Sequence, residues 1–439
     1  EDGGTDPNPD ATGNASANTI VGNSGANILA GLGGDDTLQG GDGNDTLEGG
    51  SGNDAIDGGA GDDLVLYTVG DGTDTVDGGI GTDTLSVSGT AAAESFTVEA
   101  DGANTRFLVD VGNDGSDELT ATSVENLTIA TGNGGDTVTL TGSFTGTGLT
   151  GIAVTGGTGA DTMNASAASN VAVTFDGAGG NDVLTGSAGV DTLGGGDGDD
   201  TIAGGLGADA LSGGAGTDNF NVTIAGYVAG ETIDGGSGTD TVTVSGTGTF
   251  DMNVGSITAV ERVQLSAGTA LVANATAGLA VFGTAGADTV QLGAGGQSAT
   301  MLAGNDTVTG GSGGDTIDGG EGNDTVEAGA GNDTVTGGIG DDHVIGGAGD
   351  DLYNGGAGID LINYRNATQS VTVDLANNVG AGVEIGVDQL IGFENVRGGD
   401  GKDTISGDDA ANRIFASAGG DIMDGKAGVD MYDASVQTQ

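Results

Sequence analysis

The sequence has no cysteine, only two prolines, and few aromatic or basic residues. Without cysteine the chain can form neither a disulfide framework nor a thiolate site for zinc or an iron–sulfur cluster. Phe, Trp and Tyr make up 3% of the 439 residues, so a conventional hydrophobic core is hard to build. No apolar run approaches the roughly 20 residues that a membrane helix needs, and no signal peptide is recognisable at the first residues.

Charge of one sign dominates the chain. Seven Lys and Arg residues stand against 65 Asp and Glu, which gives a formal net charge of −58. This balance argues against binding to nucleic acid or to an anionic membrane, and its self-repulsion destabilises a compact state. Hard divalent cations would both neutralise the carboxylates and cross-link the segments that carry them. The alternative is a solvated, disordered acidic chain, but the acids are not scattered.

Aspartates recur at a regular spacing of nine in four runs. The predicted metal ligands are Asp36, Asp45, Asp54, Asp63, Asp74 and Asp83 in the first run, Asp182, Asp191, Asp200, Asp209, Asp218 and Asp240 in the second, Asp306, Asp315, Asp324, Asp333, Asp342, Asp351 and Asp360 in the third, and Asp403 and Asp421 in the fourth. Asn18 and Asn27 extend the first run, and their sites are expected to be weak or empty because each lacks a charge.

The repeating unit is G-G-x-G-x-D-x-U-x, where U is aliphatic. Glycine reaches backbone angles closed to other residues, so the hexad can curl with its carbonyls turned inward. Carbonyl and carboxylate oxygens are the hard ligands that suit calcium. The x-U-x triplet is too short for a helix and fits a strand with U inward. Two units make one coil, and coils stack about 4.8 Å apart with parallel strands.

This nonapeptide resembles the RTX repeat of secreted bacterial proteins, in particular the surface-layer and adhesin-like members. The resemblance implies an all-β fold, a right-handed parallel β-roll or β-solenoid with calcium-binding turns. It also implies one calcium ion between turns one coil apart, so that Asp324 shares ions with both Asp306 and Asp342. Roughly ten to fifteen ions would then bind.

Stretches richer in Val, Thr, Phe and Leu interrupt the repeat. We predict that they form wider β coils of the same solenoid, with inserted β-sandwich domains as the alternative. The expected divisions are a linker (1–17), repeat block 1 (18–85), wider coils (86–181), repeat block 2 (182–242), wider coils (243–287), repeat block 3 (288–361), a β-rich insert (362–402) and repeat block 4, truncated (403–439).

A short motif recurs in three of the interrupting stretches. It reads Val124-Glu125-Asn126-Leu127, Val260-Glu261-Arg262-Val263 and Phe393-Glu394-Asn395-Val396. Each copy precedes an Asp-Thr-aliphatic triplet, at Asp136, Asp288 and Asp403.

No catalytic constellation is recognisable, and we do not expect an enzyme. His343 is the only histidine and follows Asp342 at an outward strand position. Gly310–Gly314 matches G-x-S-x-G only inside the repeat, with no helix to follow. A calcium-dependent polysaccharide lyase would need a basic residue, and none falls in the calcium runs of the first three blocks.

Two functions remain open. The first is a structural surface-layer, matrix or adhesin component, secreted or held at the bacterial cell surface, whose partners are calcium, copies of itself or anionic surface polysaccharide. The second is the secretion and folding module of a larger enzyme exported by a type I system. A weaker third is an ice-binding face, because outward Thr residues form regular rows.

Overall fold

The computed structural model describes residues 10–101, 106–112, 117–415 and 417–433. Within these ranges every regular element is a β-strand, and no helix is present that could cross a membrane. The chain divides into unit 1 (residues 1–240) and unit 2 (241–439), which are described separately. Most of the predicted linker lies outside the described residues.

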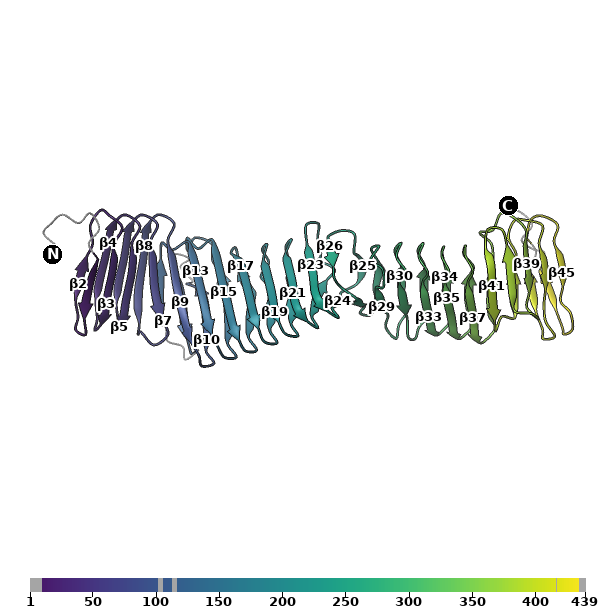
Figure 1. Cartoon of the computed structure of the whole chain (residues 1–439), viewed down its shortest axis with the longest axis horizontal. Coiled ribbons are helices and arrows are strands. Elements are labelled where there is room, and N and C mark those ends of the chain that lie inside the picture. The colour runs from purple at the N-terminus through teal and green to yellow at the C-terminus, as the bar shows by residue number, and fades with distance from the viewer. Residues whose placement is uncertain (1–9, 102–105, 113–116, 416, 434–439) are drawn as a thin grey trace. The chain divides into compact units, whose positions relative to one another are not determined.

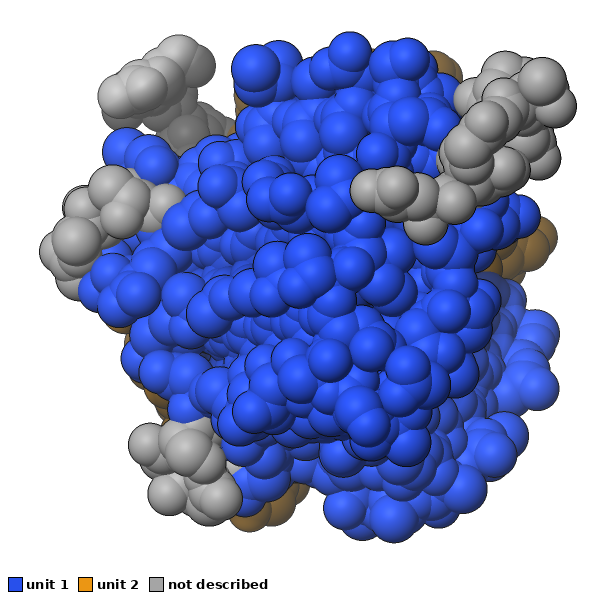
Figure 2. Space-filling view, turned by 90° about the vertical axis from the view of Figure 1, so that its left-hand side faces the viewer, with its two compact units in different colours: residues 1–240 blue, residues 241–439 orange. Residues whose placement is uncertain are grey.

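Unit 1 consists of two sheets whose strands the chain supplies in turn (Figure 1). Sheet I contains, in spatial order, β1 (Ala11–Asn14), β3 (Ile28–Gly33), β5 (Thr46–Ser51), β7 (Leu64–Thr68), β9 (Thr84–Thr90), β13 (Asn126–Gly132), β15 (Gly151–Thr158), β17 (Ala172–Gly179), β19 (Thr192–Asp197), β21 (Ala210–Gly216) and β23 (Thr232–Gly238). Sheet II contains β2 (Thr19–Val21), β4 (Thr37–Asp42), β6 (Ala55–Ala60), β8 (Asp74–Ile80), β12 (Leu119–Thr122), β11 (Phe107–Val111), β10 (Ser95–Ala100), β14 (Thr137–Ser143), β16 (Thr162–Ser169), β18 (Val183–Thr185), β20 (Thr201–Ala203) and β22 (Asn219–Thr223). Figure 2 shows unit 1 in blue, from the end that carries β1 and β2.

The strands of unit 2 follow the same plan and are grouped here as sheets III and IV. Sheet III contains β24 (Thr241–Ser245), β27 (Arg262–Gln264), β29 (Ala280–Phe282), β31 (Ser298–Thr300), β33 (Thr316–Glu321), β35 (Thr334–Ile339), β37 (Leu352–Ala357), β41 (Gly386–Ile391), β40 (Val379–Gly382), β39 (Val371–Asp374), β43 (Thr404–Ser406) and β45 (Ile422–Asp424). Sheet IV contains β25 (Gly248–Asp251), β28 (Thr269–Val272), β30 (Thr289–Gln291), β32 (Thr307–Thr309), β34 (Thr325–Glu327), β36 (His343–Ile345), β38 (Leu361–Asn363), β42 (Asn395–Arg397), β44 (Arg413–Phe415) and β46 (Met431–Asp433). The short strand β26 (Ser256–Thr258) follows β25 along the chain.

The repeat blocks form coils of the expected length. Thr316 on β33 pairs with Thr334 on β35, and Thr334 pairs with Leu352 on β37. The aspartates that precede these strands have the same separation of 18 residues per coil, since the hydrogen-bonded residues Asp315 and Asp333 lie 18 residues apart. The U positions point inward: Val308 and Ile317 are each 1% exposed, and their neighbours alternate outward, as a two-residue side-chain period requires. The predicted all-β solenoid of parallel stacked coils is confirmed.

The two longer interruptions of the repeat have the same topology: each inserts three strands into a sheet, and the middle strand is antiparallel to its neighbours. In sheet II the chain inserts β12, β11 and β10 between β8 and β14, with β11 antiparallel to both neighbours. In sheet III it inserts β41, β40 and β39 between β37 and β43, with β40 antiparallel. Both excursions continue the sheet of the solenoid instead of forming a separate sandwich.

Wider coils follow the first excursion. The hydrogen-bonded aspartates Asp136 and Asp161 lie 25 residues apart, and Asp161 and Asp182 lie 21 residues apart. From Asp182 to Asp200 the advance returns to the 18 residues of the repeat. Figure 1 shows β15, β17 and β19 side by side across this change of coil length.

Candidate metal centre

The repeat aspartates form hydrogen-bonded rows along the edges of the coils. The backbone N–H of Asp306 donates to Oδ1 of Asp324 at 2.8 Å, and that of Asp324 donates to Oδ1 of Asp342 at 2.8 Å. The same bond joins Asp182 to Asp200 at 2.8 Å. Each carboxylate therefore points back toward the preceding coil, with one of its two oxygens satisfied by the protein.

The second carboxylate oxygen has no such partner in one class of turn. In the described part of the chain no hydrogen-bond donor reaches this oxygen, although it is buried. Fifteen row residues share this property: Asp36, Asp45, Asp54, Asp63, Asp83, Asp136, Asp182, Asp200, Asp209, Asp218, Asp306, Asp324, Asp333, Asp342 and Asp360. We call these open turns. A buried carboxylate oxygen without a donor is costly unless a cation or proton meets it.

Backbone conformation distinguishes the open turns. In each of the fifteen, the residue four places before the aspartate has a positive φ, from 70° at Ala178 to 120° at Gly338. Leu32, Ala178 and Leu302 adopt this conformation without being glycine. A left-handed residue turns its peptide, so its N–H is directed away from the carboxylate.

Glycine stands at the fifth place before the aspartate in twelve of the fifteen open turns, and Thr131, Met301 and Ala328 stand there in the other three. A Cβ built on Gly319 would lie 2.5 Å from Oδ2 of Asp324 and 2.6 Å from the carbonyl oxygen of Gly337. A carboxylate oxygen and a carbonyl oxygen of the next coil thus converge beside the same Cα. At Gly319 a side chain would therefore enter this oxygen-lined cradle.

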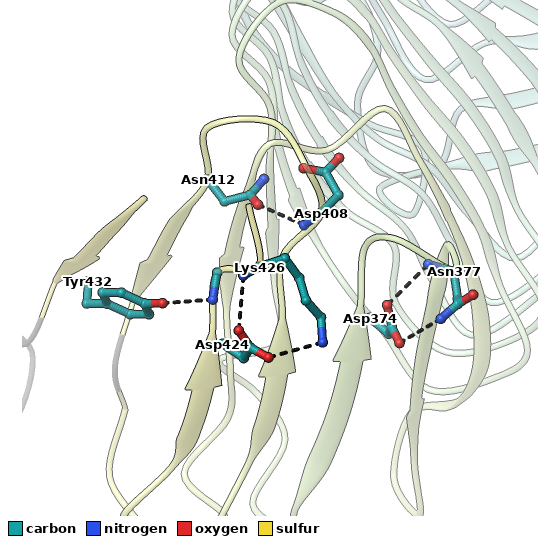
Figure 3. Close-up of polar contacts among 8 residues, drawn as sticks. Asp374, Asn377, Asp408, Asn412, Asp424, Lys426 and Tyr432 are labelled. Carbon is teal, nitrogen blue, oxygen red and sulfur yellow. Dashed lines mark hydrogen bonds and ion pairs between the residues drawn. The ribbon is translucent and has the colours of Figure 1, made fainter. Parts of the chain in front are cut away.

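A second class of turn closes on itself. Here the N–H four places before the row residue donates to its side-chain oxygen, as from Gly311 to Oδ2 of Asp315 at 2.9 Å. Figure 3 shows another, in which the N–H of Asp408 donates to Oδ1 of Asn412 at 2.8 Å. The closed turns are those of Asn18, Asn27, Glu94, Asp161, Asp191, Asp288, Gln297, Asp315, Asn412 and Asp421.

Two row residues of unit 2 are capped by tyrosine. The hydroxyl of Tyr353 donates to Oδ2 of Asp351 at 2.6 Å and accepts the N–H of Gly347 at 2.9 Å. The hydroxyl of Tyr364 donates to Oδ2 of Asp388 at 2.8 Å. Both phenols are fully buried, so at these positions a side chain supplies the donor that the open turns lack.

The predicted ligands therefore separate into groups. Most lie in open turns, but the second oxygen is hydrogen-bonded in Asp191, Asp315, Asp351, Asp403 and Asp421. Asp74 and Asp240 continue their rows by accepting the N–H of Asp54 and Asp218, both at 2.8 Å. Asn18 and Asn27, expected to be weak, form closed turns.

Burial makes several of the open-turn carboxylates hard to ionise. It raises the pKa of Asp63, Asp306 and Asp342 to about 6 and that of Asp333 to about 7. Hydrogen bonds from the row oppose the shift, and neighbouring acids add to it, such as Asp324 on Asp306. A buried row of like charges at neutral pH therefore requires compensation by positive charge.

One protein-family model matches the chain at several positions. The model of the RTX calcium-binding nonapeptide repeat matches residues 12–45, 31–65, 68–85, 155–193, 174–202, 194–224, 302–335, 327–362 and 397–432. Together the matches cover more than half of the chain. The chain belongs to the RTX calcium-binding nonapeptide repeat family. No curated protein matched it.

The residues of these RTX turns fit calcium. Calcium takes six to eight oxygen ligands from carboxylates and carbonyls in flexible geometry, and open turns offer these atom types. No group of three or more Asp, Glu or His side chains close enough to hold a metal occurs among the described residues. Each RTX site would therefore combine one or two carboxylates with backbone carbonyls. Bound calcium would supply the positive charge that the row lacks.

Sequence reasoning missed several acids of these rows, among them Glu94, Asp161, Asp288 and Asp388, and also Asp136 and three glutamates. Asp136 forms an open turn, and Gly132 and Gly134 before it were the available signal. Glu125, Glu231 and Glu394 accept the N–H of the last aspartate of a row, at 2.8–2.9 Å. Each begins an E-x-U triplet that parallels the D-x-U of the repeat, and for Glu125 and Glu394 the recurring four-residue motif already displayed it.

Proposed function

We propose that this RTX chain is an extracellular structural protein whose β-solenoid is completed by calcium ions bound in the open turns. The observation that carries the proposal is the set of fifteen buried carboxylate oxygens without a donor in the described chain. One ion per open turn would give a number of about fifteen, near the upper end of the sequence-based expectation. Asp191, Asp315, Asp351, Asp403 and Asp421 would hold none.

The extracellular assignment rests on charge and calcium supply. At −58 the chain repels itself, and cytosolic calcium is too scarce to load sites of the weak, extracellular type. Outside the cell, each ion brings two positive charges to a row of buried carboxylates. Binding free energy then becomes folding free energy.

A structural role is favoured over catalysis. The open turns repeat one arrangement of carboxylates and carbonyls, which suits cation binding and rigidity. Outward rows such as Thr316 and Thr334 present regular polar faces on which copies of the chain, or anionic surface polysaccharide bridged by calcium, could pack. The alternative is that the chain serves as the secretion and folding module of a larger enzyme. Such a module would remain monomeric.

One calcium titration tests the two functions against each other. Circular dichroism reports folding, and light scattering on the same samples reports assembly. A surface-layer, matrix or adhesin component predicts that scattering rises at calcium concentrations above those that complete folding, as further ions bridge the still acidic surfaces. Scattering that stays flat after folding is complete would contradict the structural role and favour the monomeric module.

A further inference from the structure

Three glutamates accept the N–H of an open-turn aspartate at a position where the nonapeptide carries aspartate. The N–H of Asp83 donates to Oε2 of Glu125 at 2.8 Å, and the N–H of Asp360 donates to Oε2 of Glu394 at 2.9 Å. In the same way the N–H of Asp209 donates to Oε2 of Glu231 at 2.9 Å. These bonds reproduce the Asp-to-Asp bond of the rows with a side chain one methylene longer.

Each glutamate follows an unusually long coil. Glu125 lies 42 residues beyond its partner Asp83, and Glu394 lies 34 residues beyond Asp360. The third glutamate, Glu231, lies 22 residues beyond Asp209. In the ordinary repeat the corresponding separation is 18 residues, as from one open-turn aspartate to the next in the third block.

The local sequence explains why glutamate stands there. None of the three is preceded by the G-G-x-G hexad, as the segments Thr120–Val124, Gly226–Gly230 and Gln389–Phe393 show. Without that curled turn the backbone approaches the row differently, and Asp388, which also lacks the hexad, accepts the N–H of Asp351 at the longer distance of 3.2 Å. The additional methylene of glutamate lets its carboxylate still reach the row.

The aspartate that donates its N–H to each glutamate has a buried acceptor oxygen. Oδ2 of Asp83, of Asp209 and of Asp360 is buried with no donor in the described chain, and the residues are at most 1% exposed. Glu231 is itself only 4% exposed. At each of the three positions, an acceptor-only aspartate oxygen therefore lies next to a second carboxylate.

We propose that Glu125, Glu231 and Glu394 each complete a calcium site with Asp83, Asp209 and Asp360, respectively, and that these three ions fasten the coil before each long segment to the coil after it. The inference rests on the proposed calcium binding. Closing a long loop removes more chain entropy from the unfolded state than closing a short one, so these ions hold the excursions β10–β12 and β39–β41 in place.

Isosteric substitutions test the proposal by counting bound ions. Glu394→Gln, Glu125→Gln and Glu231→Gln keep an oxygen that accepts the row N–H but remove the charge. Equilibrium dialysis with calcium at pH 7.5 should show one ion fewer for each variant and three fewer for the triple variant. Glu321→Gln and Glu48→Gln, which remove exposed charges, should bind the wild-type number.

Hydrogen exchange gives a second readout. With calcium present, Glu394→Gln should raise exchange in Val371–Ile391, whereas Glu321→Gln should not. If a glutamine variant fails to fold, Glu394→Asp keeps the charge and should fold with a weakened last site. Wild-type ion numbers and exchange in all three glutamine variants would overturn the proposal while leaving calcium binding intact. A wild-type protein that binds no calcium would instead overturn the proposed function.

Discussion

The backbone N–H of Asp324 donates to Oδ1 of Asp342 at 2.8 Å, while Oδ2 of Asp342 meets no donor within the described residues. The bond fixes the orientation of the carboxylate. Its other oxygen, Oδ2, is a buried acceptor that needs a positively charged or hydrogen-bond-donating partner. In the closed turn of Asp315 the N–H of Gly311 meets that need at 2.9 Å. One repeat thus supports two kinds of turn, of which we expect only one to depend on a cation.

Removing a charge should have different effects in the two kinds of turn. Asp324 lies between Asp306 and Asp342 in a row of open turns. Asp324→Asn should therefore weaken two adjacent sites and lower the number of bound calcium ions by up to two. Asp315→Asn, in a closed turn of the same block, should leave the number unchanged and cost about 1 kcal/mol for a lost hydrogen bond. Asn18→Ala should also leave the number unchanged. Isothermal titration of the three variants checks this, and equal losses for Asp324→Asn and Asp315→Asn would refute the division into classes.

The raised pKa values predict how the metal-depleted protein responds to pH. Burial holds the pKa of Asp63, Asp306 and Asp342 at about 6 and that of Asp333 at about 7, against about 3.9 in an unfolded chain. Because the folded state binds protons more tightly, its stability is greatest below pH of about 4 and falls as pH rises through 6 to 7. Protein stripped of calcium should therefore show more β signal by circular dichroism at pH 4 than at pH 7.5.

Bound calcium should remove this trend, because protons compete with the ion for the same oxygens. The affinity of the folded chain for calcium should rise as pH rises from 5.5 to 7.5, because the row carboxylates lose the protons that compete with the ion. Metal-depleted protein whose β signal increases with pH would show that the row carboxylates are not buried in the way described.

Two glycines differ in the space that surrounds them. Gly319→Ala would place a Cβ 2.5 Å from Oδ2 of Asp324 and 2.6 Å from the oxygen of Gly337, so the turn must shift and calcium should bind there more weakly. Gly194→Ala meets nothing within 4 Å and should be neutral or slightly stabilising. Thermal unfolding in calcium compares the two, and an equal shift in Tm would count against the cradle.

The fold was predictable from the sequence because the nine-residue repeat and the inward-facing U residues specify structure within each short segment. Val308 and Ile317 are buried as the two-residue strand period requires. The class of turn was not predictable from residue type: Ala178 adopts a positive φ in an open turn, whereas Gly311 does not in a closed one. That choice depends on how one coil stacks on the next, and so does the role of Glu394, which reaches a row 34 residues away.

The tyrosine cap should stabilise one edge of unit 2 without calcium. Tyr353→Phe leaves Oδ2 of Asp351 buried and without its 2.6 Å donor, at a cost of about 1–3 kcal/mol. At every calcium concentration that folds the chain the loss should be similar by thermal unfolding, since the hydroxyl and not an ion serves this oxygen. Tyr67→Phe, which loses only a 3.0 Å bond to the carbonyl of Gly72, is the control and should cost less. A Tyr353→Phe protein as stable as wild type would show that another donor reaches Asp351.

Far-ultraviolet circular dichroism of the purified chain at pH 7.5, with excess chelator and then with millimolar calcium, tests the central claim most directly. The open turns bury fifteen carboxylate oxygens that no donor in the described structure meets, so the chain should be largely disordered in chelator and regain its β signal when calcium is added. A full β spectrum in chelator, unchanged by calcium, would contradict the claim that calcium completes the fold.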